Sequence, residues 1–265
     1  MLGRNVRAAI VLGLAASTLL GCSARTPSSR PGPPLRVGMT PTSPPFAFRQ
    51  GGQVVGLEPD FARALAAALG RPLELRQVEW DGLIPTLQGG RIDVIMSGMT
   101  ITPARQVQIV FSDPYLRSGL LPVVRRGDVA RYPDGESVLK MANSIGVMAN
   151  TTSERFVRER EPRANLSLYP TPGAALTELL QRRVDAVIHD APVMLWLAAN
   201  EAELAPVLKP LNQESLGWGM RRSDEELRAA VNGVLARWRA DGTREQILSR
   251  WIPYWSRLED EAGKR

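Results

Sequence analysis

The chain contains one cysteine, Cys22, and one histidine, His189, among its 265 residues. A lone cysteine excludes a disulfide framework, and the two residues together offer too few nitrogen and sulfur ligands for a zinc site. Basic residues are scattered among acidic ones, and no basic strip is interleaved with aromatic residues. We therefore expect no metal, no other cofactor and no nucleic-acid partner.

Long apolar runs are also missing, because the most apolar stretch, Ala8–Leu20, is too short to span a bilayer comfortably. It follows Arg4 and Arg7, which is typical of a signal peptide. It ends in Leu-Leu-Gly-Cys22, which resembles a bacterial lipobox. We expect residues 1–21 to be removed, Cys22 to be lipidated, and residues 22–34, rich in proline and serine, to form a flexible tether. The protein would then be extracytoplasmic, in the periplasm or on the cell surface, and anchored to a membrane.

About 230 residues remain after the tether, enough for one large domain or two lobes. Their first part alternates between short apolar runs and amphipathic segments, so we expect a parallel α/β sheet whose ligand-binding groups lie at the carboxyl ends of the strands. The predicted strands are Leu35–Met39, Leu73–Val78 and Ile92–Met96. The predicted helices are Pro59–Leu69, with Glu58 and Asp60 as charges at its start, and a helix through Leu83–Leu87 capped by Asp81.

A second round with the same order follows. Its predicted strands are Ser144–Met148, Leu166–Tyr169 and Arg183–Ile188, and its helices begin after Thr151 and at Ala174. Thr151 and Glu154 fit a capping box. The apolar run Gly119–Val124 is a plausible crossover between the two rounds. The octapeptides that begin at Arg91 and Arg183 share an Arg-apolar-Asp order, which suggests two lobes that each present a polar strand end.

The segment from Arg91 to Arg105 carries the most chemistry. Small and hydroxyl-bearing residues, Ser97–Thr100, follow its strand, and Thr102-Pro103 predicts a helix start with threonine as N-cap. Free N–H groups, hydroxyls and the Arg105 guanidinium would therefore converge at one strand end. This combination suits a carboxylate. The alternative is a capped helix with a solvated arginine.

Five motifs together resemble the amino-acid type of extracytoplasmic solute-binding protein, the receptors of ABC importers. They are Gly56–Phe61, Trp80–Pro85, Ser97–Arg105, Phe111–Tyr115 and Ala240–Thr243. The resemblance implies a bilobal α/β Venus-flytrap fold whose lobes are joined by two crossover strands. It places lobe 1 in residues 35–118 and 217–265, and lobe 2 in residues 119–216.

The resemblance also implies a ligand site. Arg105 would bind the α-carboxylate of an amino acid, and Asp190 would bind its α-ammonium. The other implied contacts are the Ser97, Gly98 and Thr100 backbone with the Thr100 hydroxyl, Thr151 and Thr152 from lobe 2, and the aromatic rings of Phe46 and Trp80. A zwitterion needs one fixed cation and one fixed anion, which agrees with this pair. The alternatives are core packing for both aromatic rings and helix capping for Asp190; His189 is expected to be a bystander.

Relatives that bind cationic side chains carry an acid and an aromatic residue where this chain has Thr40 and Ser43, and no spare carboxylate is evident. We therefore expect a polar uncharged or small acidic amino acid, delivered by a monomer to an inner-membrane ABC permease without catalysis. One alternative is an enzyme similar to cyclohexadienyl or arogenate dehydratase, but Val193 stands where its acidic residue is expected and Glu154 is committed to capping. Another is a sensing module for a membrane signalling partner.

Overall fold

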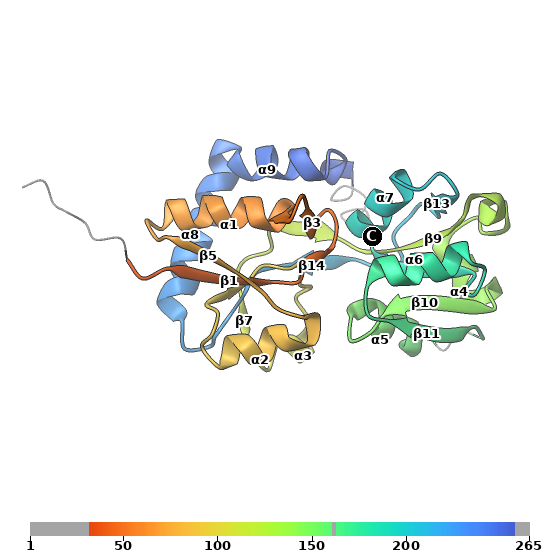
Figure 1. Cartoon of the computed structure of the whole chain (residues 1–265), viewed down its shortest axis with the longest axis horizontal. Helices are drawn as coiled ribbons and strands as arrows, with labels where there is room; N and C mark the ends of the chain where they lie inside the picture. The colour runs from red at the N-terminus through yellow and green to blue at the C-terminus, as the bar shows by residue number, and fades with distance from the viewer. Residues whose placement is uncertain (1–31, 161–162, 258–265) are drawn as a thin grey trace, which may run out of the picture. The chain divides into compact units, whose positions relative to one another are not determined.

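A computed structural model describes residues 32–160 and 163–257 (Figure 1). The predicted signal peptide, the lipidation site Cys22 and most of the predicted tether lie outside these residues. Within the described ranges, no helix combines the length and apolar character needed to cross a membrane.

The first lobe is built on a five-stranded sheet in the order β5-β1-β6-β15-β7. Strand β1 runs parallel to β5 and β6, whereas β15 runs antiparallel to β6 and β7. The strands are β1 (Leu35–Met39), β5 (Leu73–Gln77), β6 (Val94–Ile95), β7 (Val110–Phe111) and β15 (Gly219–Met220). A small antiparallel sheet, β2 (Thr42–Ser43), β3 (Ala47–Gln50) and β4 (Gln53–Val55), follows β1.

Helices cover both faces of this sheet, with α1 and α2 on opposite sides of β1 (Figure 1). They are α1 (Leu57–Ala68), α2 (Leu83–Gln88), α3 (Pro103–Gln106), α8 (Glu225–Asp241) and α9 (Thr243–Trp251). Buried Phe61 on α1 packs edge-on against Trp218, at 5.5 Å between ring centroids, and Trp218 in turn packs against Trp238 on α8. This apolar contact holds the C-terminal helices on the first lobe.

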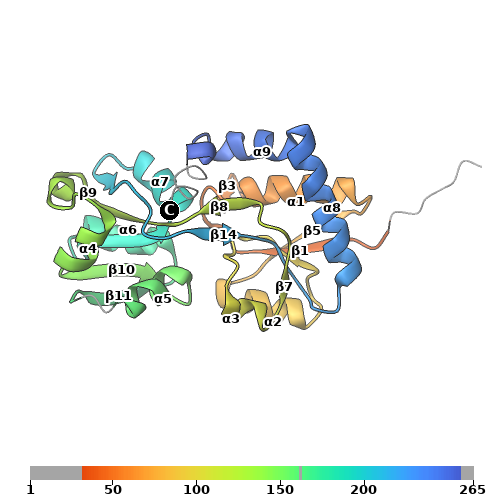
Figure 2. The same cartoon turned by 180° about the vertical axis from the view of Figure 1, so that it is seen from behind.

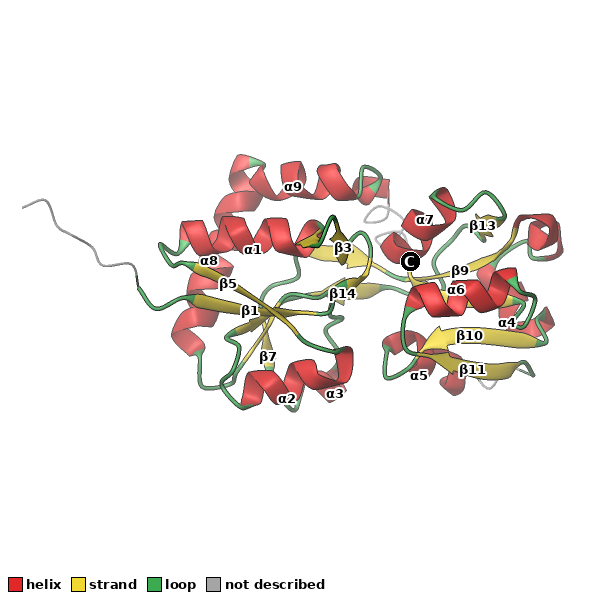
Figure 3. Ribbon diagram, viewed as in Figure 1, coloured by secondary structure: helices red, strands yellow, loops and turns green. Residues whose placement is uncertain are grey.

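The second lobe repeats the design with the sheet order β11-β10-β12-β9-β13. Figure 3 shows its strands in yellow among red helices. Strand β10 is parallel to β11 and β12, and β9 is antiparallel to β12 and β13. Its strands are β9 (Leu120–Arg125), β10 (Ser144–Met148), β11 (Asn165–Tyr169), β12 (Ala186–Asp190) and β13 (Leu204–Pro206). Its helices are α4 (Gly135–Met141), α5 (Thr152–Glu159), α6 (Pro172–Leu180) and α7 (Ala191–Ala199). The expected bilobal α/β fold is thus confirmed.

Two strands link the lobes, β8 (Leu116–Ser118) and β14 (Glu214–Leu216), and they pair antiparallel side by side (Figure 2). The prediction that Gly119–Val124 is the crossover is wrong. Most of that run is β9, which lies between β12 and β13 in the second sheet. Its leucine and valine side chains are buried in that sheet, so the apolar character of the run reflects burial inside a lobe.

Two predicted helix caps are also wrong. Asp81 lies in a 3₁₀ turn, Trp80–Gly82, and α2 begins after Gly82 without a side-chain cap. Thr151 is the N-cap residue of α5, but its hydroxyl donates to the Met148 carbonyl at 2.7 Å. The Glu154 carboxylate accepts from the Asn150 backbone N–H at 2.7 Å, one residue before the position that a capping box requires. The hydrogen bonds of Thr151 to Met148 and of Asn150 to Glu154 therefore replace the predicted capping box.

An aromatic cluster joins the lobes on the side of α7 and α9. Phe48 on β3 lies 5.8 Å from Trp196 on α7 and 5.9 Å from Trp251 on α9, measured between ring centroids. The two tryptophan rings are 6.3 Å apart. Nearby, the Tyr254 hydroxyl donates to the Pro192 carbonyl at 3.3 Å. The end of the chain's described part thus contacts the second lobe.

Candidate functional site

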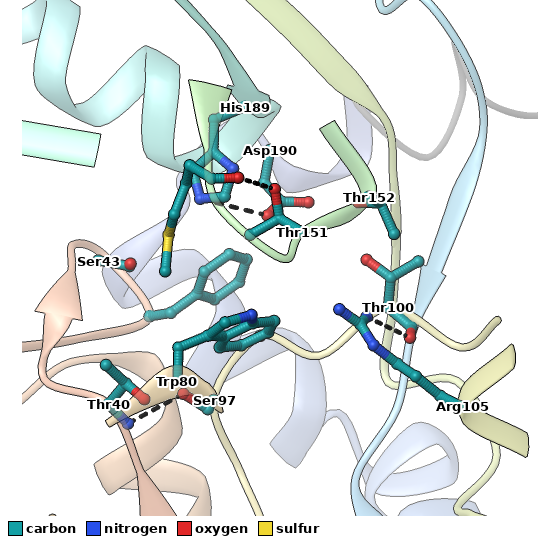
Figure 4. A pocket seen from close by; sticks show the side chains of 13 residues that line it. Thr40, Ser43, Trp80, Ser97, Thr100, Arg105, Thr151, Thr152, His189 and Asp190 are labelled. Atoms are coloured by element: carbon teal, nitrogen blue, oxygen red, sulfur yellow. Dashed lines mark hydrogen bonds and ion pairs between the residues drawn. The ribbon is translucent and has the colours of Figure 1, made fainter. Parts of the chain in front are cut away.

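One pocket brings together every residue that the sequence predicts to contact a ligand (Figure 4). Its lining comes from loops at the carboxyl ends of strands in both lobes, as expected for open α/β sheets. The predicted residues that line it are Phe46, Trp80, Ser97, Gly98, Thr100, Arg105, Thr151, Thr152 and Asp190. Thr40, Ser43, Met148 and His189 also line it.

Arg105 lies at the first-lobe side of the pocket, on α3. Thr102 caps this helix by accepting from the Arg105 backbone N–H at 3.3 Å, and Pro103 occupies its first turn, as the sequence predicts. The guanidinium donates through Nη1 to the Thr100 carbonyl at 2.8 Å and lies 5.2 Å from the Trp80 ring centroid. Burial lowers the pKa of Arg105, and the nearby Asp190 and Glu214 carboxyls oppose this shift. Arg105 is a fixed, largely desolvated cation, not the solvated arginine of the alternative interpretation.

Gly98 closes one wall of the pocket in a conformation that favours glycine. Its φ is +64°, and a Cβ atom there would lie 2.7 Å from the ring of Phe46. Its N–H donates to the Glu58 carboxylate at 2.7 Å and is therefore not directed to a ligand. Gly98 lines the pocket, and its contact with a ligand stays a prediction in which another atom than this N–H takes part.

Glu58 fixes this wall from inside the first lobe. The carboxylate is fully buried and also accepts from the Tyr115 hydroxyl at 2.6 Å and from the Trp218 indole at 3.1 Å. Burial raises the pKa of Glu58 to about 7, although these hydrogen bonds oppose the shift. The sequence predicts only a charge at a helix start here, but the contacts of Glu58 join three separate segments of the chain.

Asp190 lies at the second-lobe side of the pocket, at the end of β12. It occupies the N-cap position of α7, but its side chain makes no capping hydrogen bond, which excludes capping as its side-chain role. Its Oδ1 atom is buried and has no hydrogen-bond partner among the described residues. Burial raises the pKa of Asp190 to about 7, while the Arg105 charge opposes the rise. This carboxyl is poised to receive a hydrogen-bond donor or a cation.

His189 lines the pocket beside Asp190, with 3.7 Å between its Nε2 and the Asp190 Oδ2. Burial lowers the pKa of His189 to about 4. The imidazole is therefore neutral near pH 7 and does not form an ion pair with Asp190 there.

Glu214 is the residue that sequence reasoning missed. Its Oε2 accepts from the Thr100 hydroxyl at 2.9 Å and from the Thr152 hydroxyl at 3.2 Å, and its Oε1 accepts from the Asn212 amide at 3.1 Å. Burial and the charge of Asp190 raise the pKa of Glu214, and these three hydrogen bonds oppose the rise. A second carboxyl thus lies directly behind the pocket wall, but its hydrogen bonds are made to Thr100, Thr152 and Asn212 and it is not among the residues that line the pocket. A lone glutamate before the apolar run that leads to Met220 is its only signal in the sequence.

The two lobes touch at the rim of the pocket through Trp80. Its indole Nε1 donates to the Asn150 carbonyl at 3.0 Å, and the Asn150 amide donates to the Asp81 carboxylate at 3.0 Å. Trp80 is partly exposed and lines the pocket, whereas Phe46 is buried at 2% exposure and serves both the core and the pocket wall. These contacts assign Trp80 to the cleft.

The described residues contain no group of three or more His, Cys, Asp or Glu side chains that could hold a metal ion. The pocket instead places one guanidinium on the first lobe and, on the second, a carboxyl whose Oδ1 has no partner among the described residues, with the Trp80 ring beside the guanidinium (Figure 4). Such a pocket can enclose a small molecule that carries an anionic and a cationic group close together.

Known proteins with the same architecture support this description. Bacterial extracellular solute-binding proteins, family 3, match residues 35–254. The L-cystine-binding protein TcyJ of Escherichia coli (strain K12) is 29% identical over 220 residues, which cover 82% of each chain. A crystal structure of an ancestral amino-acid-binding protein, a precursor of cyclohexadienyl dehydratase, is 35% identical with a TM-score of 0.78, covering 83% of this chain and 95% of that one. An ancestral arginine-binding protein bound to arginine is 35% identical with a TM-score of 0.77, covering 83% and 98%. The chain belongs to the bacterial extracellular solute-binding proteins, family 3.

Proposed function

We propose that this protein is an extracytoplasmic receptor that encloses an amino acid between its lobes and delivers it to an ABC permease. The observation that carries the proposal is the placement of Arg105 and Asp190 on opposite lobes of one pocket. An α-carboxylate and an α-ammonium are two bonds apart on one carbon, and this pair offers each a partner of opposite charge. Lobe closure excludes water and strengthens both ion pairs. The amino-acid ligands named for the relatives agree with this interpretation.

The contacts of the ligand follow from the lining. Arg105, helped by the Thr100 and Thr152 side of the pocket, binds the α-carboxylate, and Asp190 binds the α-ammonium. The remaining contacts come from Ser97 and Thr151, from the Gly98 surface, and from the rings of Phe46 and Trp80, which flank the ligand side chain. No catalytic residue is assigned.

The ligand side chain is polar and uncharged in this proposal. Thr40 and Ser43 supply hydroxyls on the Trp80 side of the pocket (Figure 4), and Met148 adds a thioether to its lining. An acidic side chain, the other class that the sequence suggests, is disfavoured. It would add a third carboxylate to Asp190 and Glu214, against the guanidinium that Arg105 contributes to the pocket lining.

Two further functions are alternatives to transport. A dehydratase-like enzyme would need a general acid in the cleft. Neither position that the sequence offers for this acid supplies it: Val193 is apolar and fully buried, and the Glu154 carboxylate is bonded to Asn150 and Arg158. Asp190 is the carboxyl in the pocket lining that remains for this role, so turnover of prephenate separates the two functions. A receptor that signals to a membrane partner would have the same pocket, and only its partner would distinguish it.

The proposed receptor is a monomer held to the membrane by lipidated Cys22, in the periplasm or on the cell surface, and its permease lies in the inner membrane. The lipobox-like segment carries this part of the proposal. Labelling cells with a radioactive fatty acid tests it: the chain is expected to take up label, and a Cys22→Ser variant is not.

Isothermal titration calorimetry of the purified, ligand-stripped protein against the twenty amino acids and prephenate tests the function. Micromolar binding, about −8 kcal/mol, is expected for one polar uncharged amino acid. Turnover of prephenate without amino-acid binding would instead establish the enzyme. Tighter binding of arginine, lysine or glutamate would refute the side-chain assignment alone.

A further inference from the structure

The buried carboxyl of Glu214 joins both lobes at the pocket. It belongs to β14, one of the two linking strands, and is 9% exposed. Its Oε2 accepts from Thr100, which follows the sheet of the first lobe, and from Thr152, which begins α5 in the second lobe. One oxygen atom therefore holds a hydroxyl from each lobe.

The hydrogen-bond directions create a conflict with an anionic ligand. A threonine hydroxyl has a single proton to donate. When Glu214 is ionised, the Thr100 and Thr152 protons both point to its Oε2, and the two hydroxyls can offer only lone pairs to the pocket. A carboxylate that enters beside Arg105 then meets two acceptors with a second carboxylate behind them. Ionised Glu214 thus opposes capture of the group that Arg105 attracts.

The charged groups around Glu214 do not remove its conflict with a ligand carboxylate unless Glu214 takes up a proton. The Arg105 guanidinium interacts electrostatically with Glu214, and Asp190 is a second carboxyl that raises the pKa of Glu214. His189 is neutral near pH 7, because burial lowers its pKa to about 4. The neighbouring elements also carry Arg155 on α5, Arg117 and Ser118 on β8, and the uncharged Asn212, whose amide donates to Oε1. Arg105 therefore faces two carboxyls, and a zwitterion adds no net charge.

Binding of a zwitterion would favour different protonation states for the two carboxyls. Its ammonium group favours the ionised form of Asp190, whereas its carboxylate favours the protonated form of Glu214. A protonated Glu214 can donate to a threonine oxygen, and that threonine can then turn its own proton towards the ligand. After this exchange, the protonated Glu214 and both threonine hydroxyls each still donate one hydrogen bond.

We propose that the site captures its amino acid together with one proton held on Glu214, which reverses the hydrogen bond at Thr100 or Thr152 and makes that hydroxyl a donor to the ligand carboxylate. The proton comes from Asp190 when the pair already shares one, and from solvent when both carboxyls are ionised. The proposal rests on the proposed amino-acid function. It makes Glu214 a positioning residue, because it acts on the ligand through the threonines.

A Glu214→Gln variant tests the proposal, because the amide has the shape of a protonated carboxyl and keeps a donor. The Kd of the amino acid that binds tightest in the twenty-amino-acid panel is measured by calorimetry from about pH 6 to about pH 8.5. The wild-type affinity is expected to fall by up to about tenfold per pH unit once the pair loses its proton. The variant is expected to keep its affinity, so the ratio of the two Kd values grows with pH. Glu203→Gln, at an exposed glutamate of the second lobe, is the matched control and should follow the wild type.

A Kd ratio that does not change with pH would overturn the proposal, since a merely structural role predicts the same loss at every pH. Absence of binding by any amino acid would refute the proposed function instead. In that case, or if the variant does not fold, carbon-13 NMR of the ligand-free wild type decides the matter. Protonation of either carboxyl at about pH 7 would support a shared proton. If both are already ionised there, addition of the zwitterion glycine must protonate Glu214, and an unchanged pair of ionised carboxyl signals would overturn the proposal.

Discussion

Replacement of Asp190 by asparagine should stabilise the ligand-free protein while it destroys tight binding. Asp190 is 7% exposed, and its Oδ1 has no hydrogen-bond partner in the described part of the chain. Burial raises its pKa to about 7, so the ionised form is unfavourable in the folded state. An asparagine side chain would have nearly the same shape without the charge. The ligand would lose the partner of its α-ammonium.

The sign and the size of the effect follow from this pKa. The folded protein holds the Asp190 proton up to about pH 7, whereas the unfolded chain releases it near the ordinary value of 3.8. Folding stability therefore falls as the pH rises between these values, and the full loss is present above pH 7. At 1.36 kcal/mol per pKa unit, the difference is about 4 kcal/mol. Burial of the uncharged amide costs about 1–3 kcal/mol, which leaves a net gain of about 1–3 kcal/mol for the variant.

Thermal unfolding of the ligand-free protein at about pH 5 and about pH 8 measures this gain. A gain of 1 kcal/mol raises Tm by about 2–4 °C in a domain of this size. We expect Asp190→Asn to raise Tm at the higher pH and to change it little at the lower one. Calorimetry at the higher pH should show binding weakened at least about tenfold, because one partner of a buried ion pair is lost.

Asp93→Asn is the matched control, because the pKa of Asp93 is shifted in the opposite direction and the change in Tm should have the opposite sign. Burial alone would raise the pKa of Asp93, but hydrogen bonds from Arg36 and Arg221 lower it. Its stabilising contribution is present above the ordinary pKa and is lost in acid, so the variant should lower Tm at the higher pH. If Asp190→Asn lowered Tm at the higher pH in the same way, the reasoning on Asp190 would be refuted.

Three further variants test the pocket. Arg105→Ala should weaken amino-acid binding at least about tenfold in calorimetry, and wild-type affinity would refute its role. Gly98→Ala should lower the free energy of unfolding in urea by about 1–3 kcal/mol, since φ is +64° and the new Cβ would lie 2.7 Å from the Phe46 ring; an unchanged urea midpoint would contradict this. Trp80→Phe removes the 3.0 Å bond to the Asn150 carbonyl. It should weaken binding about fivefold, and unchanged affinity would mean that this contact does not favour closure.

The parts of the site that depend on neighbouring residues are predictable from sequence. The Thr102 cap, the helix start at Pro103 and the position of Arg105 in the first turn all follow from local backbone chemistry. Asp190 can be found because it ends a buried strand, much as polar residues follow β6. The carboxyl ends of such strands meet at the same edge of a sheet, which brings these residues into one pocket.

The remaining features depend on contacts between distant segments. Glu214 reaches the pocket only because β14 pairs with β8, and no periodicity in its own segment marks it. The Gly98 N–H is occupied by Glu58, forty residues earlier in the chain, so its neighbours cannot reveal that it is unavailable. The prediction places the crossover at the wrong segment for a similar reason. An apolar run such as that of β9 looks the same in the sequence whether it is buried in a sheet or spans two lobes.

The aromatic cluster of Phe48, Trp196 and Trp251 gives the protein its own optical reporter of lobe movement. Trp196 belongs to α7 of the second lobe and Trp251 to α9 of the first, with ring centroids 6.3 Å apart. Any hinge motion that separates these helices exposes both indoles to water and moves the emission maximum of the protein to longer wavelength. Opening and closing can therefore be followed by intrinsic fluorescence in stopped-flow experiments, without a dye and with any candidate ligand.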